Sequence, residues 1–199
     1  MNTTRDIDTT TAHTTAPMLV ETDIVTHSAA RKGLAVLRIA FGLTFLWAFL
    51  DKTFALGFAT GHDQEGVLDR FGPAAWVNGG SPTEGFLSFA VPENNPFKGF
   101  FNGLAGSTAI DWLFMLGLLG IGLALTLGIG MRVAAATGAL LYLMMYAAVL
   151  PLENNPVIDY HIIGAVSVVV LALTLAGDTW GAGSAWARTQ LVRRFPALR

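Results

Sequence analysis

The sequence of 199 residues contains no cysteine. This absence excludes disulfides, thiol redox chemistry and cysteine-ligated zinc or iron–sulfur clusters. Charged residues are also scarce, at 13% of the chain against roughly 25% in an ordinary soluble domain. The formal net charge of −2 gives no basis for nucleic-acid binding. These shortages argue against a simple soluble globule.

Long apolar runs take the place of the missing charges. They cover residues 33–50, 112–130, 133–150 and 162–177, and Arg38 is the only charged residue within them. Backbone groups in lipid must be hydrogen-bonded internally, so the runs predict helices. The sequence therefore predicts an all-α integral membrane protein, a four-helix bundle in the lipid bilayer. The last run is short; starting it at Val157 would place Asp159 and His161 at the membrane interface.

The distribution of lysine and arginine predicts the orientation of these helices. Nine of these residues lie on the side of the N-terminus and three on the other side, which favours two cytoplasmic termini. We expect a multi-pass protein of a bacterial-type cytoplasmic (inner) membrane. Residues 1–32 are Thr-rich and predict a disordered cytoplasmic tail. Residues 33–183 form the membrane domain, and residues 184–199 form a basic cytoplasmic tail.

The segment 51–111 is too long for a passive connection and predicts a structured outer loop. Helix-start signals at residues 81–84 and at Asn95-Pro96 predict two short helices in it. The second helix would place four apolar side chains on one face: Phe97, Phe100, Phe101 and Leu104. Such a helix lies in the membrane interface, caps the bundle, or faces the core of a small outer subdomain. Thr108-x-x-Asp111 predicts a capping box for the next helix.

The tetrapeptide Glu-Asn-Asn-Pro occurs twice on the predicted outer side, at residues 93–96 and 153–156. Each copy precedes a predicted helix. Asparagine caps and proline suits the first turn, so the repeat is typical of helix starts. The alternative is a pair of polar turns that frame an outer pocket.

Several stretches resemble one family of membrane proteins. Residues 37–42, with Phe45, Trp47 and Asp51-Lys52 after them, resemble the first helix of DoxX-type proteins. Residues 120–128 and Arg132 resemble the second helix and its turn. His161 at the start of the last helix and residues 176–183 at its end are similar too. The long outer loop looks more like the DoxD branch.

The resemblance carries expectations about function. It implies a four-helix membrane protein and, for the DoxD branch, a subunit of thiosulfate:quinone oxidoreductase. The expected function is a membrane subunit of a quinone-linked oxidoreductase that acts on thiosulfate or a related sulfur species, with quinone as co-substrate. The alternative is a non-enzymatic anchor or scaffold that recruits soluble redox proteins. A second oxidoreductase subunit and a homo-oligomer are the expected partners.

Few residues could carry such chemistry. The four histidines include no pair within the helices to hold a haem, and no flavin or metal site is evident in the sequence. His161 could donate to a quinone carbonyl or relay a proton with Asp159, or simply bond a loop carbonyl. Lys52 could attract an anion or act as a snorkelling anchor. The expected substrate-binding residues around it are Trp47, Asp51, Trp112 and Tyr146. Trp47 and Trp112 could equally belong to an aromatic belt.

Two tyrosines and one arginine leave further alternatives open. Tyr142 and Tyr146 lie four residues apart, a spacing that suits helix packing or a quinone lying between helices. Arg38 is costly at its depth in the membrane and needs partners. We expect a structural ion pair between Arg38 and Asp178, or contacts from Arg38 to helix-end carbonyls.

Overall fold

The computed structural model describes residues 18–63, 65–153 and 155–199. These residues form helices and no strand, which confirms the all-α prediction. Four helices are long: α2 (Ser28–Phe54), α4 (Thr108–Leu127), α5 (Met131–Ala148) and α6 (Tyr160–Leu173). The shorter elements are α1 (Glu21–Ile24), η1 (Trp76–Asn78), η2 (Phe86–Ala90), α3 (Lys98–Leu104), α7 (Gly183–Ala187), α8 (Gln190–Arg194) and η3 (Pro196–Leu198).

Three of the described helices, α2, α4 and α5, are long and apolar enough to cross a membrane. These three candidate membrane-spanning helices are what a membrane protein would have. Helix α6 is equally apolar, but its 14 residues make it shorter. At the usual helical rise it extends over about 21 Å, less than the ~30 Å of a bilayer's hydrocarbon core.

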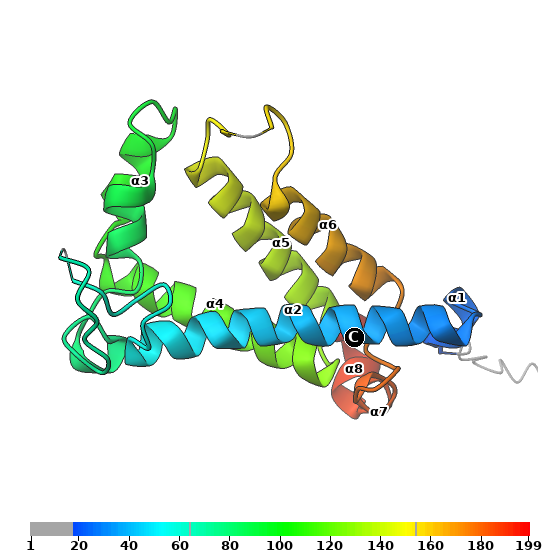
Figure 1. Ribbon diagram of the computed structural model, residues 1–199. Coiled ribbons are helices and arrows are strands. Elements are labelled where there is room, and N and C mark those ends of the chain that lie inside the picture. The colour runs from blue at the N-terminus through cyan, green and yellow to red at the C-terminus, as the bar shows by residue number, and fades with distance from the viewer. Residues whose placement is uncertain (1–17, 64, 154) are drawn as a thin grey trace, which may run out of the picture.

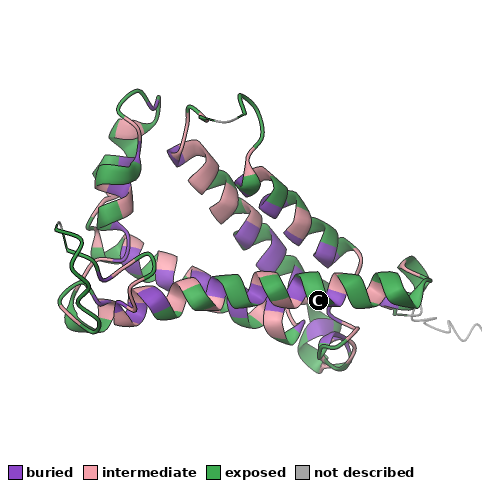
Figure 2. Cartoon of the chain, viewed as in Figure 1, coloured by how far each residue is buried: buried purple, intermediate pink, exposed green. Residues whose placement is uncertain are grey.

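The long helices form two pairs, as Figure 1 shows. Helix α2 packs along α4, and α5 packs along α6. The two pairs cross at an angle and meet where α4 ends and α5 begins (Figure 1). A hydrophobic core of residues from all four helices lies around this meeting point, with Phe45, Leu125, Met131 and Leu171 among its members. Figure 2 shows the exposed residues along the opposite faces of the helices, where apolar side chains suit lipid.

Small residues let α2 and α4 approach closely. A Cβ added at Gly42 would lie 2.7 Å from the backbone nitrogen of Thr126. A Cβ added at Gly122 would lie 3.0 Å from the backbone nitrogen of Leu46. The two glycines stand on facing helices, so each helix offers a surface without side chains to its partner.

The outer loop is fastened by buried carboxylates at both of its ends. Asp51, 1% exposed, accepts hydrogen bonds from the amides of Phe58 (3.1 Å) and Ala59 (2.9 Å). Asp111 accepts the hydroxyls of Ser81 (2.9 Å) and Thr83 (2.6 Å). The predicted capping box of Thr108 and Asp111 is therefore wrong. The residue that precedes α4 is Ser107, and the Asp111 side chain binds the loop instead.

A third polar contact joins the loop to α5. The Asn95 side chain donates to the carbonyls of Ala147 (2.8 Å), Ala148 (3.0 Å) and Leu150 (2.7 Å), at the end of α5. Its Oδ1 also accepts the amide of Phe97 (2.7 Å) just before α3. Within α3, Phe101 is buried in a small core, whereas Phe97 and Phe100 are exposed. The second helix start of the outer loop thus doubles as a cap for α5.

Folded segments replace parts of both predicted tails. Residues 18–32 contain α1 and the first turn of α2, and residues 184–199 contain most of α7 together with α8 and η3. The part of the predicted disordered tail at residues 1–17 lies outside the described residues. The missed helices lack long apolar runs, and α1 depends on contacts with the distant residues Asp178 and Thr179.

Candidate functional site

The start of α6 carries the sequence-predicted pair of Asp159 and His161. One oxygen of Asp159 accepts the backbone amides of His161 (2.9 Å) and Ile162 (3.3 Å), so Asp159 caps the helix. Its other oxygen lies 2.6 Å from Nδ1 of His161. The helix thus begins at Tyr160 rather than at Val157, because Asp159 supplies the cap.

His161 is 1% exposed, yet its second ring nitrogen, Nε2, is buried without a hydrogen-bond partner among the described residues. Leaving a buried polar atom unsatisfied is unfavourable, and such atoms are uncommon in folded proteins. The carboxylate at Nδ1 favours the tautomer with a proton on Nδ1 when the ring is neutral, and it supports a second proton on Nε2 when the ring is charged. His161 can therefore accept or donate a proton at Nε2.

The charge of Asp159 is supported by its surroundings. Burial alone would raise the pKa of this carboxyl group, but the hydrogen bonds from the His161 ring and from the two amides outweigh it and lower the pKa. Asp159 is thus an anion over the whole physiological range. An anion at Nδ1 holds the imidazole ring in one orientation.

Aromatic rings surround His161. The ring of Tyr160 lies 4.0 Å from it, and that of Tyr142 on α5 lies 6.3 Å from it, between centroids. Tyr142 packs against Gly164, one turn further along α6, and meets Phe41 and Phe45 of α2 edge to face. Nε2 of His161 is thus a buried polar atom without a partner in the described part of the chain, and it lies within an aromatic cluster from α2, α5 and α6.

Tyr142, rather than Tyr146, is the tyrosine that contacts His161. Tyr146 donates its hydroxyl proton to the carbonyl of Val157 at 2.8 Å and so holds the turn before α6. Both tyrosines were candidates because of their four-residue spacing. The sequence could not rank them, since the choice depends on where α6 begins.

Lys52 and three of the residues expected around it, all except Tyr146, lie on the other helix pair. The Lys52 ammonium group lies 5.9 Å from the ring centroid of Phe114 on α4, and it makes no ion pair among the described residues. Both oxygens of Asp51 are occupied by loop amides. Trp47 packs edge to face on Phe58 of the outer loop at 4.9 Å.

Trp112 likewise belongs to the α2–α4 pair. It packs against Trp76 at 4.7 Å and remains 52% exposed. Figure 1 shows that the C-terminal end of α2, which carries Lys52, lies away from the start of α6. The structure does not bring Lys52 together with His161 and Asp159. The predicted site is thus divided between the two helix pairs.

Arg38 forms the expected contacts with helix-end carbonyls, and it does not form the alternative ion pair with Asp178. It is 0% exposed and donates to the carbonyls of Leu125 and Thr126 at the end of α4. It also donates to three carbonyls that follow α6: those of Ala176 (3.0 Å), Thr179 (3.4 Å) and Trp180 (3.0 Å). The last carbonyls of a helix lack internal partners, and the five N–H groups of one guanidinium supply them here.

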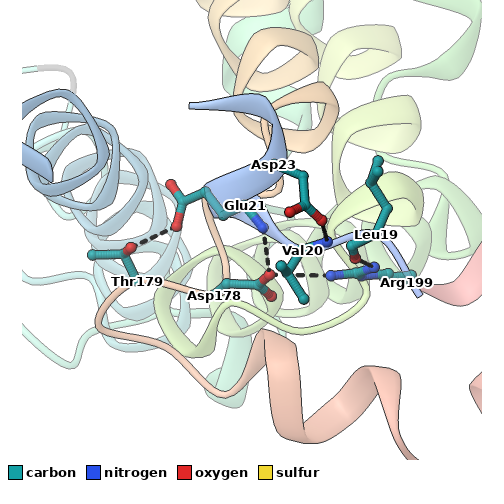
Figure 3. A network of polar contacts seen from close by, with 7 residues as sticks. All are labelled: Leu19, Val20, Glu21, Asp23, Asp178, Thr179 and Arg199. Atoms are coloured by element: carbon teal, nitrogen blue, oxygen red, sulfur yellow. Dashed lines mark hydrogen bonds and ion pairs between the residues drawn. The ribbon is translucent and has the colours of Figure 1, made fainter. Parts of the chain in front are cut away.

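Asp178 belongs instead to a polar clasp, formed by Leu19, Glu21, Asp178, Thr179 and Arg199 (Figure 3). Asp178 lies 3.1 Å from Arg199 and accepts the amide of Glu21, also at 3.1 Å. Thr179 donates its hydroxyl proton to Glu21 at 2.5 Å, and Arg199 donates to the carbonyl of Leu19. The clasp joins the segment before α2 to the segment after α6.

Glu21 makes this clasp sensitive to pH. Burial raises the pKa of its carboxyl group above the ordinary 4.5, and the negative charge of Asp178 adds to the effect. Its other oxygen, Oε1, is buried without a partner among the described residues. A raised pKa in the folded protein stabilises the fold fully below about pH 4.5, and this contribution is lost as the pH rises through the folded pKa.

Glu21→Gln is expected to remove the loss of stability at high pH, because the amide stays neutral at every pH. Its oxygen can still accept a hydrogen bond from the Thr179 hydroxyl. The variant should be more stable than the wild type at pH 8 by about 1 kcal/mol. Thermal unfolding in detergent between pH 5 and 8 measures the difference. The exposed Asp23, two residues further on, provides the control Asp23→Asn, which should leave the pH dependence unchanged. An identical pH dependence in Glu21→Gln would refute the assignment.

The arrangement at His161 offers one unpartnered polar atom beside the rings of Tyr142 and Tyr160. No group of three or more metal-ligating side chains occurs in the described ranges, 18–63, 65–153 and 155–199. Comparison of the chain with family models, curated proteins and solved structures finds no match.

Proposed function

We propose that the chain is the quinone-binding membrane subunit of an oxidoreductase, similar to DoxX and DoxD proteins. In this proposal α6 is the fourth membrane helix, with the turns on either side of it at the interfaces. The four long helices then form one bundle-like membrane domain with a structured outer loop. The proposed location is a bacterial-type cytoplasmic membrane, with both termini in the cytoplasm.

The observation that carries the proposal is the buried, unpartnered Nε2 of His161, with Asp159 on the opposite nitrogen. A quinone carbonyl is a hydrogen-bond acceptor attached to a flat apolar ring. When both of its ring nitrogens are protonated, His161 supplies the donor at Nε2, and the Tyr142 ring supplies a flat surface beside it. A ligand oxygen at Nε2 would satisfy a polar atom that the described residues leave without a partner.

The same pair of side chains can manage protons. Reduction of a quinone to a quinol takes up two electrons and two protons. His161 can pass a proton from Nε2 to a quinone oxygen and regain one afterwards, while Asp159 remains charged and stabilises the protonated ring. The electrons come from thiosulfate or a related sulfur donor.

Electron transfer has to cover the distance between the two helix pairs. Lys52, the proposed attraction point for the sulfur anion, does not share a site with His161. We therefore propose that a second subunit supplies the redox group that connects donor and quinone. This division of labour favours an incomplete complex over direct reaction between two bound substrates.

The decisive experiment uses the full chain in lipid nanodiscs. Binding of a short-tailed quinone is measured first, and quinol formation is then followed after addition of thiosulfate. Saturable binding is expected for the chain alone, and turnover is expected with the subunit that co-purifies with it. If no quinone binds, the proposal fails. If quinone binds but no sulfur donor supports turnover, the sulfur part alone fails.

Lys52→Gln is expected to raise the KM for thiosulfate about fivefold to tenfold and to leave quinone binding unchanged. The reason is the loss of one positive charge that no ion pair among the described residues compensates. Lys98→Gln is the matched control, since Lys98 is already paired with Glu93. Steady-state kinetics at low salt measures both variants. Equal effects of the two substitutions would rule out a specific role for Lys52.

A further inference from the structure

The segment that follows α6 is fixed at the end of the long helices. Helices α7 and α8 and the turn η3 lie beside the place where the two helix pairs meet (Figure 1). Trp186 donates its indole proton to the carbonyl of Leu198 at 2.7 Å. The backbone amide of Arg132, at the start of α5, donates to the carbonyl of Arg199 at 3.0 Å. These contacts fix which side chains face outward.

The segment has a buried side and an exposed side. Ala187 and Val192 are buried at 1% and 4% exposure. Leu191 and Phe195 are 48% and 50% exposed, although both are large and apolar. They stand four residues apart on one helical stripe, since the amide of Phe195 donates to the carbonyl of Leu191. Exposed apolar side chains on a fixed surface indicate a contact that is not within this chain.

Positive charge surrounds these apolar side chains. Residues 179–199 contain no aspartate or glutamate. Arg188, Arg193 and Arg194 are exposed and take part in none of the ion pairs of the described residues. The guanidinium of Arg194 lies 5.6 Å from the centroid of Phe195, so charge and ring form one surface.

The surface lies at the ends of the long helices, and this position indicates what surrounds it. Helix α4 ends at Leu127, α5 begins at Met131 and α6 ends at Leu173, all at this end of the molecule. The ends of membrane-spanning helices lie at the depth of the lipid headgroups. Arginine at this depth meets phosphate, and neighbouring apolar side chains can enter the outer part of the acyl layer. An acidic soluble protein would complement the charge but would leave Leu191 and Phe195 against water or lipid.

We propose that Arg188, Leu191, Arg193, Arg194 and Phe195 form an interfacial surface that binds anionic phospholipid headgroups. The three guanidinium groups bind headgroup phosphates. Leu191 and Phe195 enter the boundary of the acyl chains. The surface anchors the end of the chain's membrane domain to one leaflet, independently of any quinone chemistry.

The absence of cysteine allows a clean test. Gln190→Cys places a single thiol on the exposed side of α8, and a fluorophore attached to it reports contact with lipid. Glu65→Cys, in the exposed outer loop, is the matched control position. Each labelled protein is placed in nanodiscs of phosphatidylcholine, with or without phosphatidylglycerol. Quenching by a lipid that carries a nitroxide near its headgroup is then measured.

Quenching at residue 190 is expected to exceed that at residue 65 and to rise severalfold with phosphatidylglycerol. Each arginine near an anionic surface contributes roughly a fivefold gain in affinity. Replacing all three arginines with glutamine should therefore reduce quenching to the level in phosphatidylcholine, as should high salt. Replacing all three with lysine should preserve it, and thermal unfolding shows whether each variant is folded.

Quenching measurements on protein that keeps the three arginines are sufficient to overturn the proposal. Equal quenching at residues 190 and 65, or equal quenching with and without phosphatidylglycerol, would show that the surface does not bind anionic lipid. Binding of an acidic soluble protein with no response to lipid charge would assign the surface to a protein partner instead.

Discussion

His161→Phe is expected to lower the affinity for a short-tailed quinone about tenfold and kcat/KM for quinone about a hundredfold or more. Phenylalanine fills nearly the same volume among the rings of Tyr142 and Tyr160 but offers no polar atom. Asp159 keeps the two backbone amides that it caps. The fold should therefore persist while the ligand contact is lost. Quinone titration and steady-state kinetics in nanodiscs measure the two effects.

Two controls separate the ligand contact from a structural effect. His62→Phe changes an exposed histidine in the outer loop and should leave quinone binding unchanged. Asp159→Asn keeps a side chain at the helix cap but removes the charge next to Nδ1, so we expect a smaller loss of rate than in His161→Phe. Wild-type quinone affinity in a folded His161→Phe protein would exclude His161 from the site.

Arg38→Leu is expected to destabilise the protein by about 3 kcal/mol or more and to lower its thermal midpoint in detergent by roughly 10 °C. The variant removes all five N–H donors from carbonyls at the ends of α4 and after α6. Leucine is favourable in lipid, so insertion of α2 should be retained. The stability is lost because the contact between the two helix pairs is weakened.

Arg38→Lys tests the reason for this loss. Lysine keeps the charge but has three donors at one point, so it cannot reach both sets of carbonyls and should recover only part of the stability. Val36→Ala, at a 56% exposed position of the same helix, is the control and should change little. A thermal midpoint unchanged in Arg38→Leu would show that the carbonyl contacts do not hold the helix pairs together.

The apolar runs predicted the helices well because hydrophobicity in lipid is a local property of the sequence. The predicted ranges 33–50, 112–130 and 133–150 overlap most of α2, α4 and α5. The cost of a buried arginine also showed that Arg38 needs partners. The expected alternative, contacts to helix-end carbonyls, agrees with the bonds to Leu125 and Thr126. The carbonyls after α6 could not be named in advance, because their positions depend on how the chain turns after Ala176.

The candidate site was predicted only in part for the same reason. His161 and Asp159 lie two residues apart, so their contact follows from the helix start. Lys52 and Asp51 belong to a different helix pair, and sequence order contains no information about the angle between the pairs. Glu21 went unnoticed because the apolar residues on either side of it form only short runs. Its burial depends on Asp178 and Thr179, which lie far away in the sequence.

The polar clasp also constrains the order in which the protein can assemble. Glu21 precedes Asp178 by 157 residues, and Leu19 precedes Arg199 by 180. During synthesis the first half of the clasp must wait until α6 has been made and the segment after it has folded back. Protection of residues 19–24 from protease therefore shows that synthesis has passed Arg199, and a ribosome-bound intermediate that ends within α6 should be cleaved there.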